Sequence, residues 1–308
     1  MTRRMITGLI LALTGLGPAN ADKPETGESS PKIIGYLPDY RLTGNALANV
    51  AKCTDVVFFG SEILGDGSIK MAGQNTQALA KLQKACRKNN AKLHLCLGGW
   101  KKDTHYPKVT ADPKLRDKVI DELLKLRRKH GFHGVDYDWE YPKTKAEMEG
   151  FIALCRETKS RLGKDFQVTA AFHPRHKIPK GLVEQLDRIH LMTYDLEAPH
   201  CAISHSRTAI EEWTSQGIPS QKLCIGIASY ARDLKDRAKV KTYEQLFKEH
   251  GKTVHQTMPV NGFFGDNQKS ALQKLDLAKK EKLAGVIIWE IGQTPAGKDS
   301  ILKLFPPN

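Results

Sequence analysis

Residues 131–142 read Gly-Phe-His-Gly-Val-Asp-Tyr-Asp-Trp-Glu-Tyr-Pro. In an extended strand, side chains two positions apart point to the same face. Asp136, Asp138 and Glu140 therefore share one face of this segment, and the apolar residues between them share the other. The apolar face needs cover from other elements, so the three carboxylates are predicted to point into the interior of a closed sheet. Because burying like charges together is costly, at least one of them is expected to hold a proton at neutral pH.

Short apolar, β-branched segments recur along the rest of the chain. Each is too short for a helix, and most are apolar without interruption, which is typical of strands that are covered on both faces. Such strands occur in parallel sheets. The predicted strands are Ile33–Tyr36, Asp55–Phe59, Leu93–Leu97, Gly134–Asp138, Gln167–Ala171, Ile189–Thr193, Leu223–Ile227 and Gly285–Trp289.

Amphipathic, lysine-rich segments with helical spacing lie between these strands. The alternation predicts an α/β fold, and eight strands in one chain predict a single-domain (β/α)8 TIM barrel over residues 32–308. The alternative, an open doubly wound sheet, lacks a G-x-G-x-x-G segment after its first strand. The predicted helices are Thr76–Asn89, Asp112–His130, Lys145–Leu162, His205–Gln216, Thr242–His250 and Asn267–Lys282.

The region between the last two predicted strands is short. Residues 233–284 contain two predicted helices and the segment Gly262-Phe-Phe-Gly265, which is expected to be a loop. A large insertion domain at this place is therefore not expected. We infer a comparatively shallow, open cleft.

Glu140 is placed where barrel enzymes keep their chemistry. Pro142 ends the predicted strand, so Glu140 lies at its carboxyl end, the face of the barrel that carries active sites. Asp138 lies one pleat deeper, and a neighbouring carboxylate raises the pKa of a proton donor. The segment therefore predicts a general acid.

Residues 131–142 resemble the D-G-x-D-x-D-x-E signature of family 18 glycoside hydrolases, which are chitinases and endo-β-N-acetylglucosaminidases. Further similarities follow in the family's order, from Gly35 to about Gln293. They are Cys-Leu-Gly-Gly-Trp at residues 96–100, Met-Thr-Tyr-Asp at 192–195, Gly226-Ile227 with Tyr230 and Arg232, and Gly-Val-Ile-Ile-Trp at 285–289. The ordered set is much more specific than any one of its members.

The resemblance implies a retaining mechanism in which the sugar's own acetamido group attacks the anomeric carbon. Glu140 would act as general acid and then as base, Asp138 would orient the acetamido nitrogen with Asp136 behind it, and Tyr194 would donate to the acetamido oxygen. No metal and no cofactor are implied. The residues expected to bind the sugar chain are Asp195, Met192, Trp289, Trp100, Tyr36 and Arg232.

Two residues depart from the family pattern. His133 stands where the signature has its first aspartate, so an altered internal hydrogen-bond network is expected. Cys96 replaces a serine, and a thiol is the weaker donor, so support of Asp136 is expected to be weaker. Trp213 is expected to lie in the core. For His173, at the end of a predicted strand, there are two interpretations, a residue that lines the cleft and a satisfied structural histidine, and the second is favoured.

The predicted function is hydrolysis of β-1,4 linkages in N-acetylglucosamine polymers, chitin or chito-oligosaccharides. One alternative is an endo-β-N-acetylglucosaminidase that acts on N-glycans or on the glycan strands of peptidoglycan. Another is a non-catalytic sugar-binding lectin, which the presence of Glu140 disfavours. The net charge of +14 suggests nucleic acid, but no nucleic-acid-binding motif is present, so none is expected as a partner.

The N-terminus predicts export. Arg3 and Arg4 precede an apolar stretch and the A-x-A site Ala19-Asn20-Ala21, which indicates a signal peptide over residues 1–21 and a flexible leader over 22–31. The protein is expected to be secreted or periplasmic and monomeric, without membrane insertion, since no apolar run approaches the roughly 18–20 residues of a membrane span. Six cysteines permit disulfides, and Cys53 with Cys86 is a candidate pair.

Overall fold

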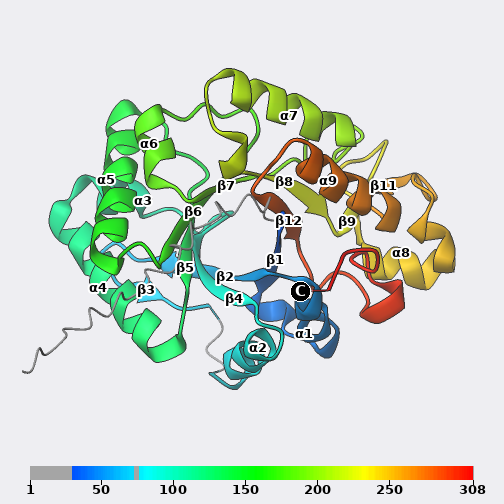
Figure 1. Ribbon diagram of the computed structural model, residues 1–308, viewed down its shortest axis with the longest axis horizontal. Coiled ribbons are helices and arrows are strands. Elements are labelled where there is room, and N and C mark those ends of the chain that lie inside the picture. Colours follow the sequence, from blue (N-terminus) through cyan, green and yellow to red (C-terminus); the bar gives the residue numbers. More distant parts are fainter. Residues whose placement is uncertain (1–29, 73–75, 308) are drawn as a thin grey trace, which may run out of the picture.

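The computed structural model describes residues 30–72 and 76–307. Eight parallel strands form a closed ring, since the first of them pairs with both the second and the last (Figure 1). The fold is therefore the predicted single-domain (β/α)8 barrel. Around the ring the strands are β1 (Lys32–Pro38), β2 (Asp55–Ile63), β4 (Lys92–Gly98), β5 (Gly134–Asp138), β6 (Gln167–Phe172), β7 (Arg188–Leu191), β8 (Leu223–Ala228) and β12 (Gly285–Trp289).

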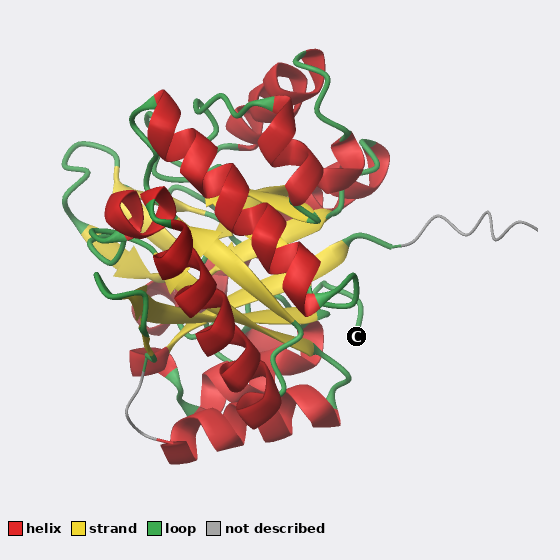
Figure 2. Ribbon diagram, turned by 90° about the vertical axis from the view of Figure 1, so that its left-hand side faces the viewer, coloured by secondary structure: helices red, strands yellow, loops and turns green. Residues whose placement is uncertain are grey.

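Helices surround the ring of strands, as Figure 2 shows from the side. Local signals set their ends: Thr144 and Glu147 form a capping box at the start of α5, and Gly131 ends α4 with φ 70°. The six helices predicted from periodicity are all present, with small shifts of their ends. They are α2 (Thr76–Lys88), α4 (Pro113–His130), α5 (Lys145–Leu162), α7 (Ile203–Ser215), α8 (Tyr243–His250) and α9 (Gln268–Lys280). Three short helices were not predicted: α1 (Gly44–Asn49), α3 (Tyr106–Ala111) and α6 (Lys180–Gln185).

The alternation along β5 is the predicted one. Val135, Tyr137 and Trp139 belong to the apolar layer between strands and helices, where Trp213 also lies at 1% exposure. Asp136 and Asp138 point the other way, into the barrel, and both are buried. The expected core role of Trp213 is confirmed.

A small antiparallel sheet lies between β8 and β12. It consists of β9 (Tyr230–Asp233), β10 (Val240–Thr242) and β11 (Phe263–Gly265), with β9 in the middle. The Gly262–Gly265 segment, expected to be a loop, is thus largely a strand, because pairing with β9 supplies hydrogen bonds that its short sequence does not predict. A two-residue strand, β3 (Ile69–Lys70), adds to the edge of β2.

All six cysteines lie among the described residues, and all are buried free thiols. The candidate pair Cys53 and Cys86 is therefore not a disulfide here. The Cys53 thiol donates to the Asn49 carbonyl across 3.6 Å instead, and burial raises the pKa of Cys86 to about 12.

Over the described residues, no helix is both long and apolar enough to cross a membrane. The predicted signal peptide and most of the predicted leader (residues 1–29) lie outside those residues.

Candidate active site

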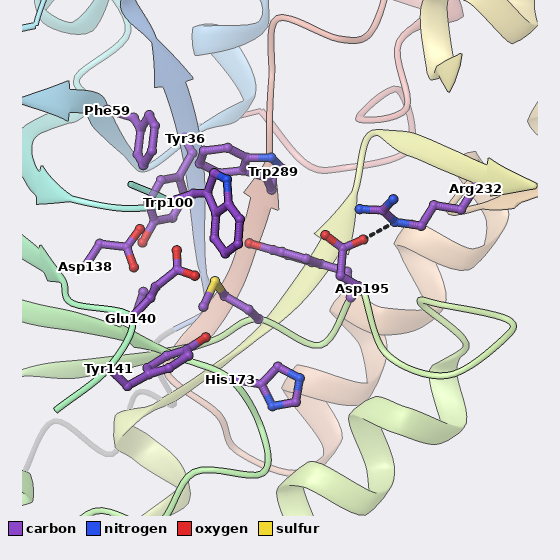
Figure 3. Close-up of a pocket in the computed structure, with 13 residues that line it drawn as sticks. Tyr36, Phe59, Trp100, Asp138, Glu140, Tyr141, His173, Asp195, Arg232 and Trp289 are labelled. Carbon is purple, nitrogen blue, oxygen red and sulfur yellow. Dashed lines mark hydrogen bonds and ion pairs between the residues drawn. The ribbon is translucent and has the colours of Figure 1, made fainter. Parts of the chain in front are cut away.

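A cavity of about 510 Å³ opens at the carboxyl ends of the barrel strands (Figure 3). Residues from eight parts of the chain meet there, which is the usual arrangement in barrel enzymes. The lining consists of Tyr36, Phe59, Trp100, Asp138, Glu140, Tyr141, Ala171, His173, Met192, Tyr194, Asp195, Arg232 and Trp289.

A glycine pair at the end of β4 makes room for the carboxylates. Gly98 and Gly99 have φ of 101° and 94°, a region that other residues adopt at a cost. A Cβ on Gly98 would lie 2.2 Å from the carbonyl oxygen of Asp138, and the amide of Gly99 donates to that oxygen across 2.7 Å. The close approach of these two strand ends fixes where Asp138 and Glu140 lie.

The surroundings of Glu140 raise the pKa of its carboxyl group. Partial burial, together with the charges of Asp103 and Asp195, raises its pKa to about 7. Asp103, in the loop after β4, also accepts the backbone N–H of Glu140 across 3.1 Å. In Figure 3 the Glu140 side chain points into the cavity beside Asp138.

Asp136 and Asp138 have opposite environments. Burial and the charges of Glu140 and Asp136 raise the pKa of Asp138 well above its usual range. Burial alone would also raise the pKa of Asp136, but contacts with His190, Thr169 and Tyr36 hold it below the ordinary value. The two shifts have opposite directions, so Asp138 is the member of the pair that holds a proton more readily.

Tyr194 and Asp195 extend from the end of β7 toward the opposite wall of the cavity. Gly226 on β8 gives the ring of Tyr194 its space, since a Cβ there would lie 2.7 Å from ring carbons. Arg232 on β9 pairs with Asp195, with Nε 2.5 Å from Oδ1. Hydrogen bonds from His200 and Arg232 outweigh burial and hold the pKa of Asp195 below its usual value.

Aromatic rings form the apolar walls of the cavity. Trp289 meets Phe59 edge to face, with ring centroids 4.7 Å apart, and lies 5.7 Å from the ring of Tyr36. Trp100 is 73% exposed at the rim. Flat apolar surfaces of this kind suit ligands with one face of C–H groups.

The structure brings nine of the ten predicted site residues to the cavity and buries Asp136 directly behind them. Their catalytic and binding roles remain predictions. His173, which follows β6 and is partly buried, lines the cavity, and its Nδ1 also accepts the backbone N–H of Arg175 across 3.3 Å.

Four other residues of the site were not predicted from the sequence: Phe59, Tyr141, Ala171 and Asp103. Phe59 and Tyr141 follow the rule that side chains at carboxyl ends of barrel strands face the site, and this rule could have found them. Asp103 lies in an irregular loop, and nothing in its local sequence indicates a contact with Glu140.

The two departures from the family pattern have different outcomes. His133 is exposed at the start of β5, where its Nδ1 accepts the backbone N–H of Leu93, so the expected change to the internal network does not arise from its side chain. Cys96 is fully buried inside the barrel near Asp136. Three other residues, Tyr36, Thr169 and His190, place donors against the Asp136 carboxylate, so its support does not depend on Cys96.

Among the described residues, no group of three or more His, Cys, Asp or Glu side chains could hold a metal ion. The site's own groups are a carboxyl group, Glu140, whose pKa is raised to about 7, a buried pair of carboxyl groups whose pKa values are shifted in opposite directions, and a buried tyrosine hydroxyl. This set can protonate a leaving group and stabilise charge that develops beside it.

Residues 32–294 match the sequence pattern described as glycosyl hydrolases family 18. An endochitinase of Manduca sexta is 27% identical over 179 residues, which is 46% of this chain and 32% of that protein. A class V chitinase of Arabidopsis thaliana is 29% identical over 174 residues, 47% of this chain and 46% of that protein. The match thus spans less than half the length of either relative. A crystal structure of a GH18 chitinase from Flavobacterium johnsoniae superimposes with a TM-score of 0.77 and 19% identity, over 90% of this chain and 93% of that one.

Proposed function

This chain belongs to glycosyl hydrolase family 18, and from that premise we propose that it hydrolyses β-1,4 linkages of chitin or chito-oligosaccharides. The observation that carries the proposal is Glu140, whose pKa is raised to about 7 at the open end of the barrel, beside Asp138, whose pKa is also raised. Curated relatives named as chitinases support the choice of substrate.

In the proposed reaction, Glu140 protonates the glycosidic oxygen as the bond to the leaving sugar breaks. The carbonyl oxygen of the substrate's 2-acetamido group attacks the anomeric carbon and forms a cyclic oxazolinium ion. The carboxylate of Glu140 then takes a proton from water, whose oxygen opens the ring from the same face as the original bond. The product keeps the β-configuration.

The neighbouring groups stabilise this intermediate. Asp138 accepts the acetamido N–H, and the negative charge of the Asp136–Asp138 pair offsets the positive charge of the ring. The Tyr194 hydroxyl, which is unionised because burial raises its pKa, donates to the acetamido oxygen.

The remaining lining residues bind the sugar chain. Trp289 stacks under the reacting sugar, and exposed Trp100 stacks on the next sugar on the leaving side. Met192 contacts the acetamido methyl group, Tyr36 closes the inner end of the cavity, and Asp195 and Arg232 bind hydroxyl groups.

The test is to incubate the purified protein with N-acetylglucosamine oligomers, an N-glycopeptide and peptidoglycan, beside Glu140→Gln. We expect the wild type to cleave the oligomers with β-anomer as first product, and Glu140→Gln to bind them with kcat reduced about 10³-fold or more. Cleavage of only the glycopeptide or only the peptidoglycan would show that the substrate is that glycan and not chitin. Binding without cleavage by both proteins would make it a lectin, and full activity of Glu140→Gln would refute the assigned acid.

We also propose that the protein is exported and acts as a monomer. Residues 1–21 have the order of a signal peptide, a basic start, an apolar stretch and an A-x-A site. Expression with and without these residues, followed by fractionation and light scattering, tests both points. A chain found only in the cytosol, or a stable dimer, would contradict them.

A further inference from the structure

An imidazole lies beside the carboxyl pair inside the barrel. His190, on β7, is completely buried. Its Nδ1 is 3.1 Å from Oδ1 of Asp136 and 2.7 Å from the hydroxyl oxygen of Tyr36. The steps proposed above give this residue no role, and it does not line the cavity.

The contacts of Tyr36 show which nitrogen of His190 carries hydrogen. The single hydroxyl hydrogen of Tyr36 is donated to Oδ2 of Asp136 across 2.6 Å. The hydroxyl oxygen is therefore the acceptor toward His190, and Nδ1 must carry a hydrogen. That same N–H faces Oδ1 of Asp136. The other ring nitrogen, Nε2, is buried with no hydrogen-bond partner among the described residues.

Asp136 consequently receives three donors. Thr169 donates to Oδ1 across 2.5 Å, Tyr36 donates to Oδ2, and His190 approaches Oδ1. With donors at both oxygens, a proton on either one would face another donor. Hydrogen bonds to the charged form favour that form, so Asp136 is the ionised member of the pair.

Asp138 lacks the hydrogen-bond donors that surround Asp136. Its side chain is 3% exposed, and its Oδ1 has no hydrogen-bond partner among the described residues. A buried carboxylate without donors is costly, whereas a protonated carboxyl is not. Asp138 is also one pleat nearer to Glu140 than Asp136 is.

We propose that His190 is a positioning residue: it holds Asp136 as the ionised acceptor and so keeps the single proton of the carboxyl pair on Asp138. This inference rests on the proposed function. The protonated Asp138 can donate to the carboxylate that Glu140 becomes after it has protonated the leaving group. Its other oxygen remains free to accept the acetamido N–H.

Other titratable groups face His190 or its partner Asp136 from the surrounding strands. His94 on β4 and Arg188 on β7 lie on the side away from the cavity, where both contact Asp55. The titratable or charged side chains near His190 and Asp136 are those of Tyr36, His94, Cys96, Asp138, Arg188 and Cys224, together with Asp136 itself.

The test compares His190→Leu with His190→Asn. Leucine removes the donor, whereas the amide nitrogen of asparagine can replace Nδ1–H. In His190→Leu, Asp136 takes up a proton more readily, and protonation of both carboxyls inactivates the site. We therefore expect the acid limb of the kcat–pH profile to move upward by about one to two pH units. KM should change little, and His190→Asn should recover most of the shift. Thr169→Val, which removes a different donor, should move the limb in the same direction.

A second measurement does not depend on turnover. Carboxyl ¹³C NMR of aspartate-labelled protein, assigned with Asp136→Asn and Asp138→Asn, reports which member carries the proton. We expect Asp138 to be protonated and Asp136 ionised in the wild type at neutral pH, and the protonated fraction of Asp136 to rise in His190→Leu. A protonated Asp136 in the wild type overturns the proposal, even if the leucine variant does not fold.

The kinetic and spectroscopic results separate the two proposals. An acid limb that stays in place in a folded His190→Leu protein also overturns the role of His190, as does equal loss of stability in both variants without a pH shift. A wild type that cleaves no glycan would instead refute the proposed function, and the NMR result would still decide the protonation of the pair.

Discussion

The backbone N–H of Glu140 donates to Oδ2 of Asp103 across 3.1 Å, which ties the proposed acid to a carboxylate in the loop after β4. The contact has two effects. It holds the backbone at Glu140 in place, and it puts the negative charge of Asp103 close enough to raise the pKa of Glu140.

Asp103→Asn should separate these effects, because the amide oxygen can still accept the N–H while the charge is lost. A lower pKa of Glu140 means that its proton is lost earlier as pH rises. We expect the basic limb of the kcat/KM profile to move down by about 0.5–1 unit. Asp165→Asn, an exposed carboxylate before β6, is the control and should leave the limb in place. An unchanged limb in Asp103→Asn would mean that the charge of Asp103 does not raise the pKa of Glu140.

Glu140→Gln should change how stability depends on pH. The folded pKa of Glu140 is about 7, above the ordinary 4.5, so the folded state favours the protonated form. The wild type therefore loses stability as pH rises from about 4.5 to 7, whereas glutamine cannot ionise. We expect the variant to gain about 1–3 kcal/mol relative to the wild type between pH 4.5 and pH 8. Urea unfolding at both pH values measures this, and an equal difference at both would contradict the raised pKa.

Trp100→Ala should weaken sugar binding without affecting the fold, because this side chain is 73% exposed. Loss of one stacked ring should raise KM for oligomers about 3–10-fold. Thermal unfolding should shift by less than the equivalent of about 0.5 kcal/mol. Trp100→Phe keeps an aromatic face and should retain most of the affinity. A large fall in stability would show that Trp100 supports the rim rather than the substrate.

Lys274→Met should destabilise the barrel strongly. Lys274 on α9 is completely buried, with Nζ 2.6 Å from Oδ2 of Asp266 and 3.0 Å from the carbonyl oxygen of Gly226. Without the lysine, Asp266 is a buried charge that has lost its cation, at a cost of about 3–5 kcal/mol. Lys269→Met, exposed on the same helix, is the matched control. Equal unfolding midpoints for the two variants would contradict the structural role of the pair.

The barrel could be predicted from the sequence because its strands are short apolar runs between amphipathic helices. Two of the eight predicted strands, Gly134–Asp138 and Gly285–Trp289, have the predicted ends. The short helices and the sheet of β9, β10 and β11 could not be predicted in this way. Segments of three to six residues have too little periodicity, and pairing with distant residues decides their structure.

The same distinction applies to the site. Asp136, Asp138 and Glu140 lie two positions apart along the chain, so the alternation of one strand is enough to bring them together. His190 reaches Asp136 from a strand that begins 52 residues further along the chain. Its contact depends on the register between strands, and no local pattern reveals that register.

Tyr36 and Trp289, whose rings lie 5.7 Å apart, come from β1 and β12, the first and last strands of the ring. Their meeting requires the two ends of the barrel sequence to pair, so neither half of the chain carries the complete cavity. During refolding, recovery of catalysis should therefore lag behind recovery of helical circular dichroism. The time course of activity recovery would then report when β1 and β12 pair and the ring of strands closes.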